Sequence, residues 1–254
     1  MTVETGDSTL PPSAVAGGSN QTASCCSVVM KACDHIRRKL YGTTSETVGG
    51  SGSGEATGSG NLEDAFNRLK LGAIEEYAEF LPPGAKPDAI KQLYAGKPSR
   101  GGGSHGQKLM YALGAEFVEV RVHARTREIR VPRIVGAFAA GRLMNTRTAR
   151  SQYMGGMIWG ISSALHEATE IDPRLARYIN DNLADYLIRV NADVQQLEVI
   201  LVPEEDSFVN PAGVKGIGEL GNVGTAAAVD NAVYHATGVR VWKLPIRLEK
   251  LLTA

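Results

Sequence analysis

Two segments near the middle of the chain alternate apolar and polar residues with a period of two. They are EFVEVRVH (116–123) and IRVPRIVGAF (129–138), and only five residues, Ala124 to Glu128, separate them. A period of two places every second side chain on the same face of a β-strand. The pattern predicts two strands joined by a short connection, and any fold of this chain has to contain that pair.

Helical periodicity surrounds the strand pair. Apolar residues recur at helical spacing in 22–40, 147–168 and 222–236, and the last of these segments is followed by Gly238, a typical helix terminator. In 147–168 the expected buried face carries Met154 and Met157, and Gly155-Gly156 permits close backbone approach. LEVILV (197–202) predicts a further strand. This irregular order of strands and helices favours an α+β fold with mixed sheets and packed helices.

Composition shifts divide the chain into three parts. Residues 43–60 are almost entirely Gly, Ser and Thr, a helical piece is expected at 61–80, and a Pro/Gly-rich stretch ends near Gly106. We therefore expect an N-terminal segment at 1–42, a flexible elaboration at 43–106 and a C-terminal domain at 107–254.

Bulk composition excludes several classes of protein. Of the 254 residues, 27 are Lys or Arg and 27 are Asp or Glu, so the chain has no excess of positive charge with which to bind nucleic acid. No apolar run is long enough to cross a membrane, and the first residues do not resemble a signal peptide. A cytoplasmic protein is expected, or a periplasmic one if a partner directs export.

The sequence contains no spacing typical of a metal site. Cys25, Cys26 and Cys33 match neither a zinc ribbon nor an iron–sulfur ligand set, and the five histidines are far apart. The cysteines are expected to be buried, inert thiols on a helix.

Three Gly-rich or polar loops each lead into a helix: 17–24, 145–152 and 215–221. A helix N-terminus offers unpaired N–H groups and the positive end of a dipole, which suit a phosphate. Three such loops point to a large phosphate-bearing ligand. The alternative is three ordinary helix caps.

The third loop, Gly216-Ile217-Gly218-Glu219-Leu220-Gly221, matches the string G-x-G-x-x-G. A dinucleotide fingerprint needs a strand leading directly into the turn and an acidic residue about 20 positions later. Neither is found here, which argues against a nicotinamide site. We expect Glu219, set among three glycines and followed by apolar Leu220, to be partly desolvated, which would raise its pKa toward the range of a general base. Lys215 would moderate that shift or bind a ligand oxygen. The alternative is a solvated loop glutamate.

At these loops the sequence resembles the molybdenum-binding subunit of the xanthine dehydrogenase and aldehyde oxidase family. The likeness is strongest in NPAGVKGIGELGNVGTAAAVDNAVYHATGVRVWKLPI (210–246), and it extends to 6–24, to EFVEVRV and to 136–167. The resemblance implies a molybdopterin-binding domain that is incomplete at its N-terminus, because the family's large subunits are much longer. It makes 1–42 a partial cofactor-binding segment and 107–254 the C-terminal cofactor-binding domain that carries the base.

The resemblance also implies roles for particular residues. Glu219 corresponds to the glutamate that takes a proton from the hydroxide ligand of molybdenum. Gln152 matches a glutamine that hydrogen-bonds the cofactor, and Asn145 lines the same pocket. The remaining cofactor-binding positions are Thr22, Ala23, Ser24, Lys215, Gly216, Ile217 and Gly218.

Bacterial members of this family carry molybdopterin cytosine dinucleotide with molybdenum, and partner subunits carry iron–sulfur clusters and FAD. The expected substrate is an aldehyde or an N-heterocycle. The expected partners are those two subunits and the remaining N-terminal part of the molybdenum subunit. The competing interpretation is a non-catalytic cofactor-binding or assembly fragment from a truncated or split gene.

Overall fold

The structure of the chain is a computed structural model that describes residues 2–42, 61–82, 84–97, 104–105 and 108–252. Two compact units are present. The N-terminal unit comprises residues 1–111 and 204–216, and the C-terminal unit comprises residues 112–203 and 217–254. Each unit is described by itself.

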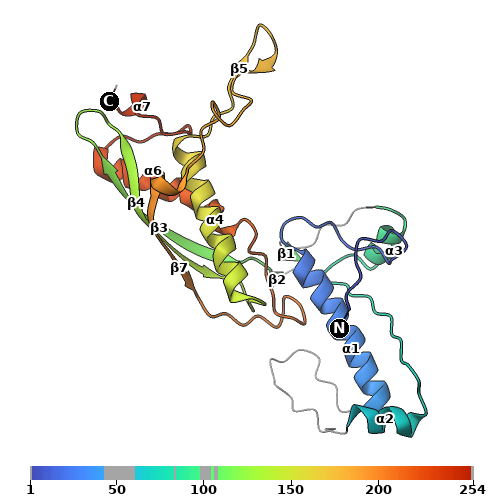
Figure 1. Cartoon of the computed structure of the whole chain (residues 1–254). Helices are drawn as coiled ribbons and strands as arrows, with labels where there is room; N and C mark the ends of the chain where they lie inside the picture. Colours follow the sequence, from blue (N-terminus) through green and yellow to red (C-terminus); the bar gives the residue numbers. More distant parts are fainter. Residues whose placement is uncertain (1, 43–60, 83, 98–103, 106–107, 253–254) are drawn as a thin grey trace. The chain divides into compact units, whose positions relative to one another are not determined.

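A three-stranded mixed sheet forms the base of the C-terminal unit (Figure 1). Strand β3 (Leu113–Val122) pairs antiparallel with β4 (Ile129–Ala139), which pairs parallel with β7 (Val194–Leu201). The predicted strand pair is confirmed, as is the strand at 197–202. The strand prediction succeeds because the alternation in β4 follows burial: Ile134 and Phe138 are buried, while Arg133 is exposed to solvent.

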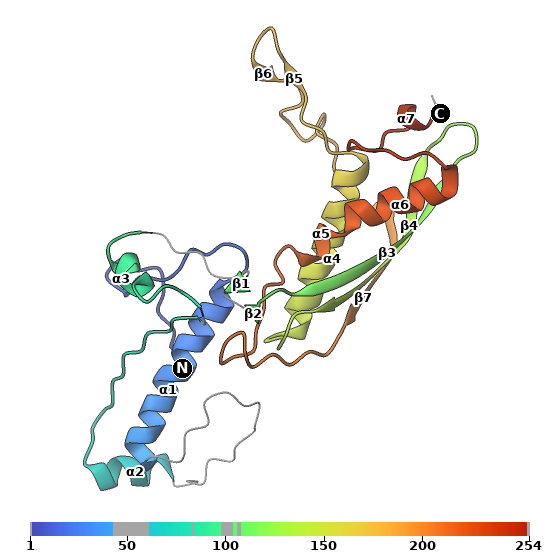
Figure 2. The ribbon, with the colours of Figure 1, turned by 180° about the vertical axis from the view of Figure 1, so that it is seen from behind.

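Three helices complete the C-terminal unit's core (Figures 1 and 2). They are α4 (Thr146–Leu165), α5 (Leu220–Val223) and α6 (Thr225–Thr237). The rings of Phe138 and Tyr153 stack with centroids 4.3 Å apart, which joins β4 to α4. Met157 and Val229 are fully buried in the same cluster. Each large apolar side chain buried in this way contributes about 1.5–3 kcal/mol.

Both long helices of this unit were predicted from periodicity, and both are confirmed. Helix α6 ends at Gly238, which adopts the left-handed conformation expected of a C-terminal glycine (φ 74°). The predicted face of α4 is only partly right. Met157 is buried but Met154 is 36% exposed, because the helix turns the side of Tyr153, Met157 and Ile161 toward the sheet.

Short elements follow the C-terminal end of α4. The hairpin of β5 (Ile171–Asp172) and β6 (Arg177–Tyr178) extends away from the sheet, as Figures 1 and 2 show. A 3-10 turn, η1 (Asn191–Asp193), leads into β7, and α7 (Glu249–Leu252) lies near the C-terminus. Together with the mixed sheet and packed helices, these elements confirm an α+β fold.

The N-terminal unit contains α1 (Gln21–Tyr41), α2 (Leu62–Leu69) and α3 (Ala89–Tyr94), with the short pair β1 (Ser104–His105) and β2 (Lys108–Leu109). The helix predicted at 22–40 is confirmed as α1. The prediction of a helix over 61–80 is wrong beyond Leu69, the last residue of α2. The helix ends there because the next residue, Lys70, adopts a left-handed conformation (φ 54°).

Two further expectations concern this unit. The expectation that the cysteines are buried is wrong. Cys25 and Cys33 are exposed, since little of α1 is covered apart from Ser27 and Leu40. The low-complexity segment at 43–60 lies outside the described residues. The domain limits at 42 and 106 remain a prediction. No helix in the described part of the chain combines the length and apolar character needed to cross a membrane.

Candidate functional site

The second half of the glycine motif forms a turn that leads into α5. The Leu220 N–H donates to the carbonyl of Ile217 and the Asn222 N–H to that of Glu219. From α4, Gln152 Nε2 donates to the carbonyl oxygen of Gly218 at 2.6 Å. The predicted residues Gln152 and Gly218 are therefore in direct contact, and the amide fixes the backbone immediately before Glu219.

Glu219 is the residue at the start of α5, and its side chain is exposed. In the described part of the chain its carboxylate has no hydrogen bond or ion pair. The expected desolvation is therefore not observed. The physical reason is that neighbouring glycines have no side-chain atoms with which to cover a carboxylate. The carboxylate is open to a ligand.

Close packing of backbone against backbone holds the turn on α4. A Cβ added to Gly221 would lie 2.6 Å from the carbonyl oxygen of Tyr153, and one added to Gly156 would lie 2.9 Å from the carbonyl carbon of Gly221. Gly155 has nothing within 4 Å. Of the two glycines expected to allow close approach, only Gly156 does so, because Gly155 faces away from α5.

Asn145 caps α4. Its Oδ1 accepts hydrogen bonds from the N–H groups of Arg147 (3.0 Å) and Thr148 (3.2 Å). An N-cap of this kind satisfies donors that an incoming phosphate would otherwise use. For this loop, the structure shows the ordinary helix cap that the sequence had left as the alternative.

The first loop, in the N-terminal unit, is bent by left-handed conformations at Gly18 and Ser19 (φ 60° and 61°). Asn20 does not cap α1 with its side chain, and its Nδ2 donates back to the carbonyl of Gly17 at 2.8 Å. The predicted residues Thr22, Ala23 and Ser24 form the first turn of α1. The Ser24 N–H donates to the Asn20 carbonyl at 3.0 Å, and no Asn20 side-chain cap covers the N–H groups of the residues before it, where an anion could bind.

The motif's first glycine contacts this first loop. A Cβ added to Gly216 would lie 2.9 Å from Ser19 Cβ and 3.1 Å from the carbonyl oxygen of Gly18. Only glycine permits that approach. The sequence contains no local signal that pairs residues 18–19 with residue 216.

Lys215 is held by two carboxylates of its own unit. Its Nζ lies 2.6 Å from Glu204 Oε1 and 3.0 Å from Asp206 Oδ2, and its side chain is only 6% exposed. Burial opposes the charge, but the hydrogen bonds to Glu204 and Asp206 outweigh it and raise the pKa of Lys215. Burial likewise opposes ionisation of Asp206, yet the ammonium lowers the pKa of that carboxyl. The Lys215 side chain is thus occupied by a structural ion-pair triad, whereas the sequence suggested a ligand oxygen or Glu219 as its partner.

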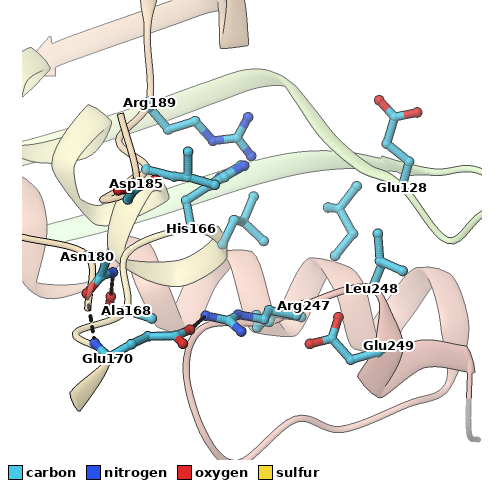
Figure 3. Close-up of a pocket in the computed structure, with 14 residues that line it drawn as sticks. Glu128, His166, Ala168, Glu170, Asn180, Asp185, Arg189, Arg247, Leu248 and Glu249 are labelled. Carbon is cyan, nitrogen blue, oxygen red and sulfur yellow. Dashed lines mark hydrogen bonds and ion pairs between the residues drawn. The ribbon is translucent and has the colours of Figure 1, made fainter. Parts of the chain in front are cut away.

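A cavity of about 540 Å³ lies at the opposite end of α4 (Figure 3). His166, which follows the last residue of α4, lines it, as do Arg189 and Arg247; Arg247 pairs with Glu170 at 2.8 Å. A 20-residue helix is about 30 Å long, so this cavity is remote from Asn145 at the N-terminal end of α4. None of the predicted site residues lines it.

Comparisons with known proteins identify the family of the chain. The family model described as "Molybdopterin cofactor-binding domain" matches residues 1–195. The aldehyde oxidoreductase molybdenum-binding subunit PaoC of Escherichia coli (strain K12) is 36% identical over 252 residues, which are 99% of this chain and 32% of that protein. The xanthine dehydrogenase molybdenum-binding subunit of Escherichia coli O157:H7 is 35% identical over 140 residues, which are 55% of this chain and 18% of that protein.

Among solved structures, the aldehyde oxidoreductase from Desulfovibrio desulfuricans ATCC 27774 shares the fold. The TM-score is 0.67 at 23% identity, over 94% of this chain and 23% of that one. The chain spans about a third of the length of the curated relatives that match nearly all of it. The match to PaoC covers nearly the whole chain, whereas the family model ends before the glycine motif.

Proposed function

This chain belongs to the family of molybdopterin cofactor-binding domains, and from that premise we propose that it supplies Glu219 as the general base of an oxidative hydroxylation. The activity is that of an oxidoreductase, and the substrate is an aldehyde or an N-heterocycle. The relatives' names support this proposed class of substrate, since they include molybdenum-binding subunits of aldehyde oxidoreductase and xanthine dehydrogenase.

The observation that carries the proposal is the state of Glu219. Its carboxylate is exposed and has no partner within the described residues, while Gln152 and the Gly221–Tyr153 contact fix the backbone on both sides of it. A general base needs a fixed position together with an accessible oxygen. The turn provides both.

The residues present fit the cofactor. The bound molybdenum group would supply the two-electron redox chemistry, and this chain would bind and orient it. The N–H groups of Thr22 and Ala23 at the start of α1 suit a phosphate, and Ser24 follows them in the same turn with its N–H on the Asn20 carbonyl. The backbone of Gly216, Ile217 and Gly218 would lie against the cofactor. Gln152 orients the turn and lends its side-chain oxygen to the cofactor. Lys215 acts through its ion pairs, which hold the segment that carries Gly216.

During turnover, Glu219 accepts a proton at a carboxylate oxygen and later returns it to solvent. The full assembly would use molybdopterin cytosine dinucleotide, an iron–sulfur subunit, an FAD subunit and the rest of the molybdenum-binding subunit. We place that assembly in the cytoplasm, or in the periplasm if a partner carries an export signal.

A second candidate function is a non-catalytic one, in which the chain binds cofactor or assists assembly. The chain spans 32% of the length of PaoC. Many residues of a complete molybdenum-binding subunit therefore have no counterpart in this sequence.

Metal and pterin analysis of the chain purified with its partner chains distinguishes the two candidates. Hydroxylation of an aldehyde or N-heterocycle by a preparation that contains stoichiometric molybdenum and pterin supports the enzyme. Cofactor without turnover supports the binding fragment. Absence of both molybdenum and pterin contradicts the enzyme and favours the non-catalytic candidate in its assembly form. Cytidine nucleotide released on acid hydrolysis would identify the dinucleotide form.

A further inference from the structure

Thr225, the first residue of α6, is completely buried and lies between two acceptors. Its Oγ1 is 2.5 Å from Glu116 Oε2 on β3 and 2.9 Å from the carbonyl oxygen of Gly221. The hydroxyl thus connects a strand of the sheet to the glycine that follows Glu219 by two residues.

Close packing gives this hydroxyl a fixed position. A Cβ added to Gly160 of α4 would lie 2.4 Å from Thr225 Cβ, and one added to Gly224 would lie 3.3 Å from Glu116 Oε2. A side chain at position 160 would clash with Thr225, and one at position 224 would require the Glu116 carboxylate to shift slightly. The arrangement of Glu116, Thr225 and Gly221 is therefore determined by contacts from α4 and β3 as well as from α6.

The number of protons available limits the hydrogen bonds that Thr225 makes to Glu116 and to the Gly221 carbonyl. A hydroxyl has one proton to donate, so Thr225 can donate to only one of its two acceptors at a time. Burial raises the pKa of Glu116, partly offset by the hydrogen bond from Thr225. While Glu116 is ionised it accepts from Thr225, and whenever it carries a proton it can donate to Thr225 and leave the hydroxyl proton for the Gly221 carbonyl. Glu119 and His235 are the other titratable groups that line the cavity beside Glu116.

We propose that Thr225, held by Glu116, is a positioning residue that fixes the Gly221 side of the turn and so aims the Glu219 carboxylate. The proposal rests on the function proposed above for Glu219. Gln152 fixes the turn at Gly218, before the base, and Thr225 fixes it at Gly221, after the base. The sequence did not single out either Glu116 or Thr225. Glu116 occupies a polar position of an alternating strand, and Thr225 resembles an ordinary first residue of a helix.

The test compares Thr225→Val and Thr225→Ser in the complete enzyme assembled with its partner chains. Valine keeps the shape and removes the hydroxyl, whereas serine keeps the hydroxyl. We expect Thr225→Val to lower kcat per molybdenum by about 10- to 100-fold with KM little changed, because small displacements of reacting groups cost rates of this order. Thr225→Ser should recover most of the loss.

Thr237→Val is the matched control. Thr237 lies at the other end of α6, and its hydroxyl donates to the carbonyl of Val233 at 2.7 Å in the same i to i−4 arrangement. If Thr237→Val lowers kcat as much as Thr225→Val, the effect is a general loss of helix stability and the proposal is wrong. A wild-type kcat in Thr225→Val contradicts it as well.

Glu116 supplies a second route if Thr225→Val does not fold. Glu116→Gln retains groups that accept from and donate to Thr225, whereas Glu116→Ala removes them. We expect the alanine variant to lose kcat and the glutamine variant to keep it, and equal values in both contradict the proposal. If Glu219→Gln is fully active, the proposed function itself fails. If Glu219→Gln is inactive while Thr225→Val and Glu116→Ala are normal, only the positioning role fails.

Discussion

Gln152 donates a hydrogen bond of 2.6 Å to the backbone carbonyl of Gly218, the residue immediately before Glu219. Gln152 is on α4, whose next residue, Tyr153, stacks on Phe138 of the central sheet. The orientation of the turn is therefore linked to the buried core of the C-terminal unit. A chemical group on a loop is positioned most accurately when rigid elements support it.

Gln152→Leu removes this hydrogen bond with little change in side-chain size. Because the side chain is exposed, we expect a loss of about 0.5–1.5 kcal/mol in the free energy of unfolding at most, together with a clear fall in kcat per molybdenum. Denaturant unfolding and steady-state kinetics measure the two quantities. Gln195→Leu, at an exposed position of β7, is the control and should change neither. Unchanged turnover in Gln152→Leu would show that the contact does not support the base.

The paired glycines of α4 allow an internally controlled test of packing. Gly156→Ala would place its Cβ 2.9 Å from the Gly221 backbone, so we expect a destabilisation of about 1–3 kcal/mol. Gly155→Ala meets no neighbour within 4 Å and should stabilise the helix by about 0.5–1 kcal/mol. Thermal unfolding of the two variants measures the contrast. Equal effects of the same sign would contradict the close contact between α4 and α5.

Lys215 is expected to matter for stability. Lys215→Met leaves the carboxylates of Glu204 and Asp206 close together without their cation, and breaking a buried ion pair costs about 3–5 kcal/mol. Chemical denaturation monitored in the N-terminal unit measures the loss. Lys91→Met, at an exposed position of α3 in the same unit, should have little effect. A Lys215→Met protein as stable as the wild type would mean that the triad contributes nothing.

Glu116 predicts a particular dependence of stability on pH. Burial raises its pKa above the ordinary value of 4.5, so the folded state binds the proton more tightly than the unfolded state. The stability that this proton contributes is fully present below about pH 4.5 and is lost as the pH rises through the folded-state pKa. Glu116→Gln keeps a neutral group at every pH.

The difference in melting temperature between Glu116→Gln and the wild type should therefore increase in favour of the variant from pH 4 upward and then level off. Thermal melts in a series of buffers from pH 4 to pH 8 measure it. Glu119→Gln, an exposed residue of the same strand, is the control and should show no comparable trend. A difference that is largest at the acidic end would contradict the assignment.

Local periodicity was sufficient to predict the elements that bury one face. The period-two alternation in β3 and β4 and the helical spacing in α4 and α6 reflect contacts that repeat along the chain, so a short window of sequence contains them. The helix expected at 61–80 shows the limit of this reasoning, since it ended at Lys70 for reasons of backbone conformation that residue spacing does not reveal.

Contacts between residues that are distant in the sequence could not be predicted in this way. The pairing of Lys215 with Glu204 and Asp206, the contact of Gly216 with Ser19 and the hydrogen bond of Thr225 to Glu116 depend on tertiary structure. The same holds for the exposure of Glu219, because a glycine-rich neighbourhood does not determine how much solvent reaches a carboxylate. The role of Glu219 was suggested by family resemblance, and its orientation by the structure.

The most direct test of the account is turnover per molybdenum of Glu219→Gln in the complete enzyme, measured beside the wild type and Glu219→Asp. Glutamine keeps the size of the side chain and cannot accept the proton. The account predicts that Glu219→Gln retains molybdenum and pterin, keeps its melting temperature and loses nearly all turnover, while Glu219→Asp keeps a measurable fraction. A fully active Glu219→Gln enzyme with normal molybdenum content would contradict the assignment of Glu219 as the base.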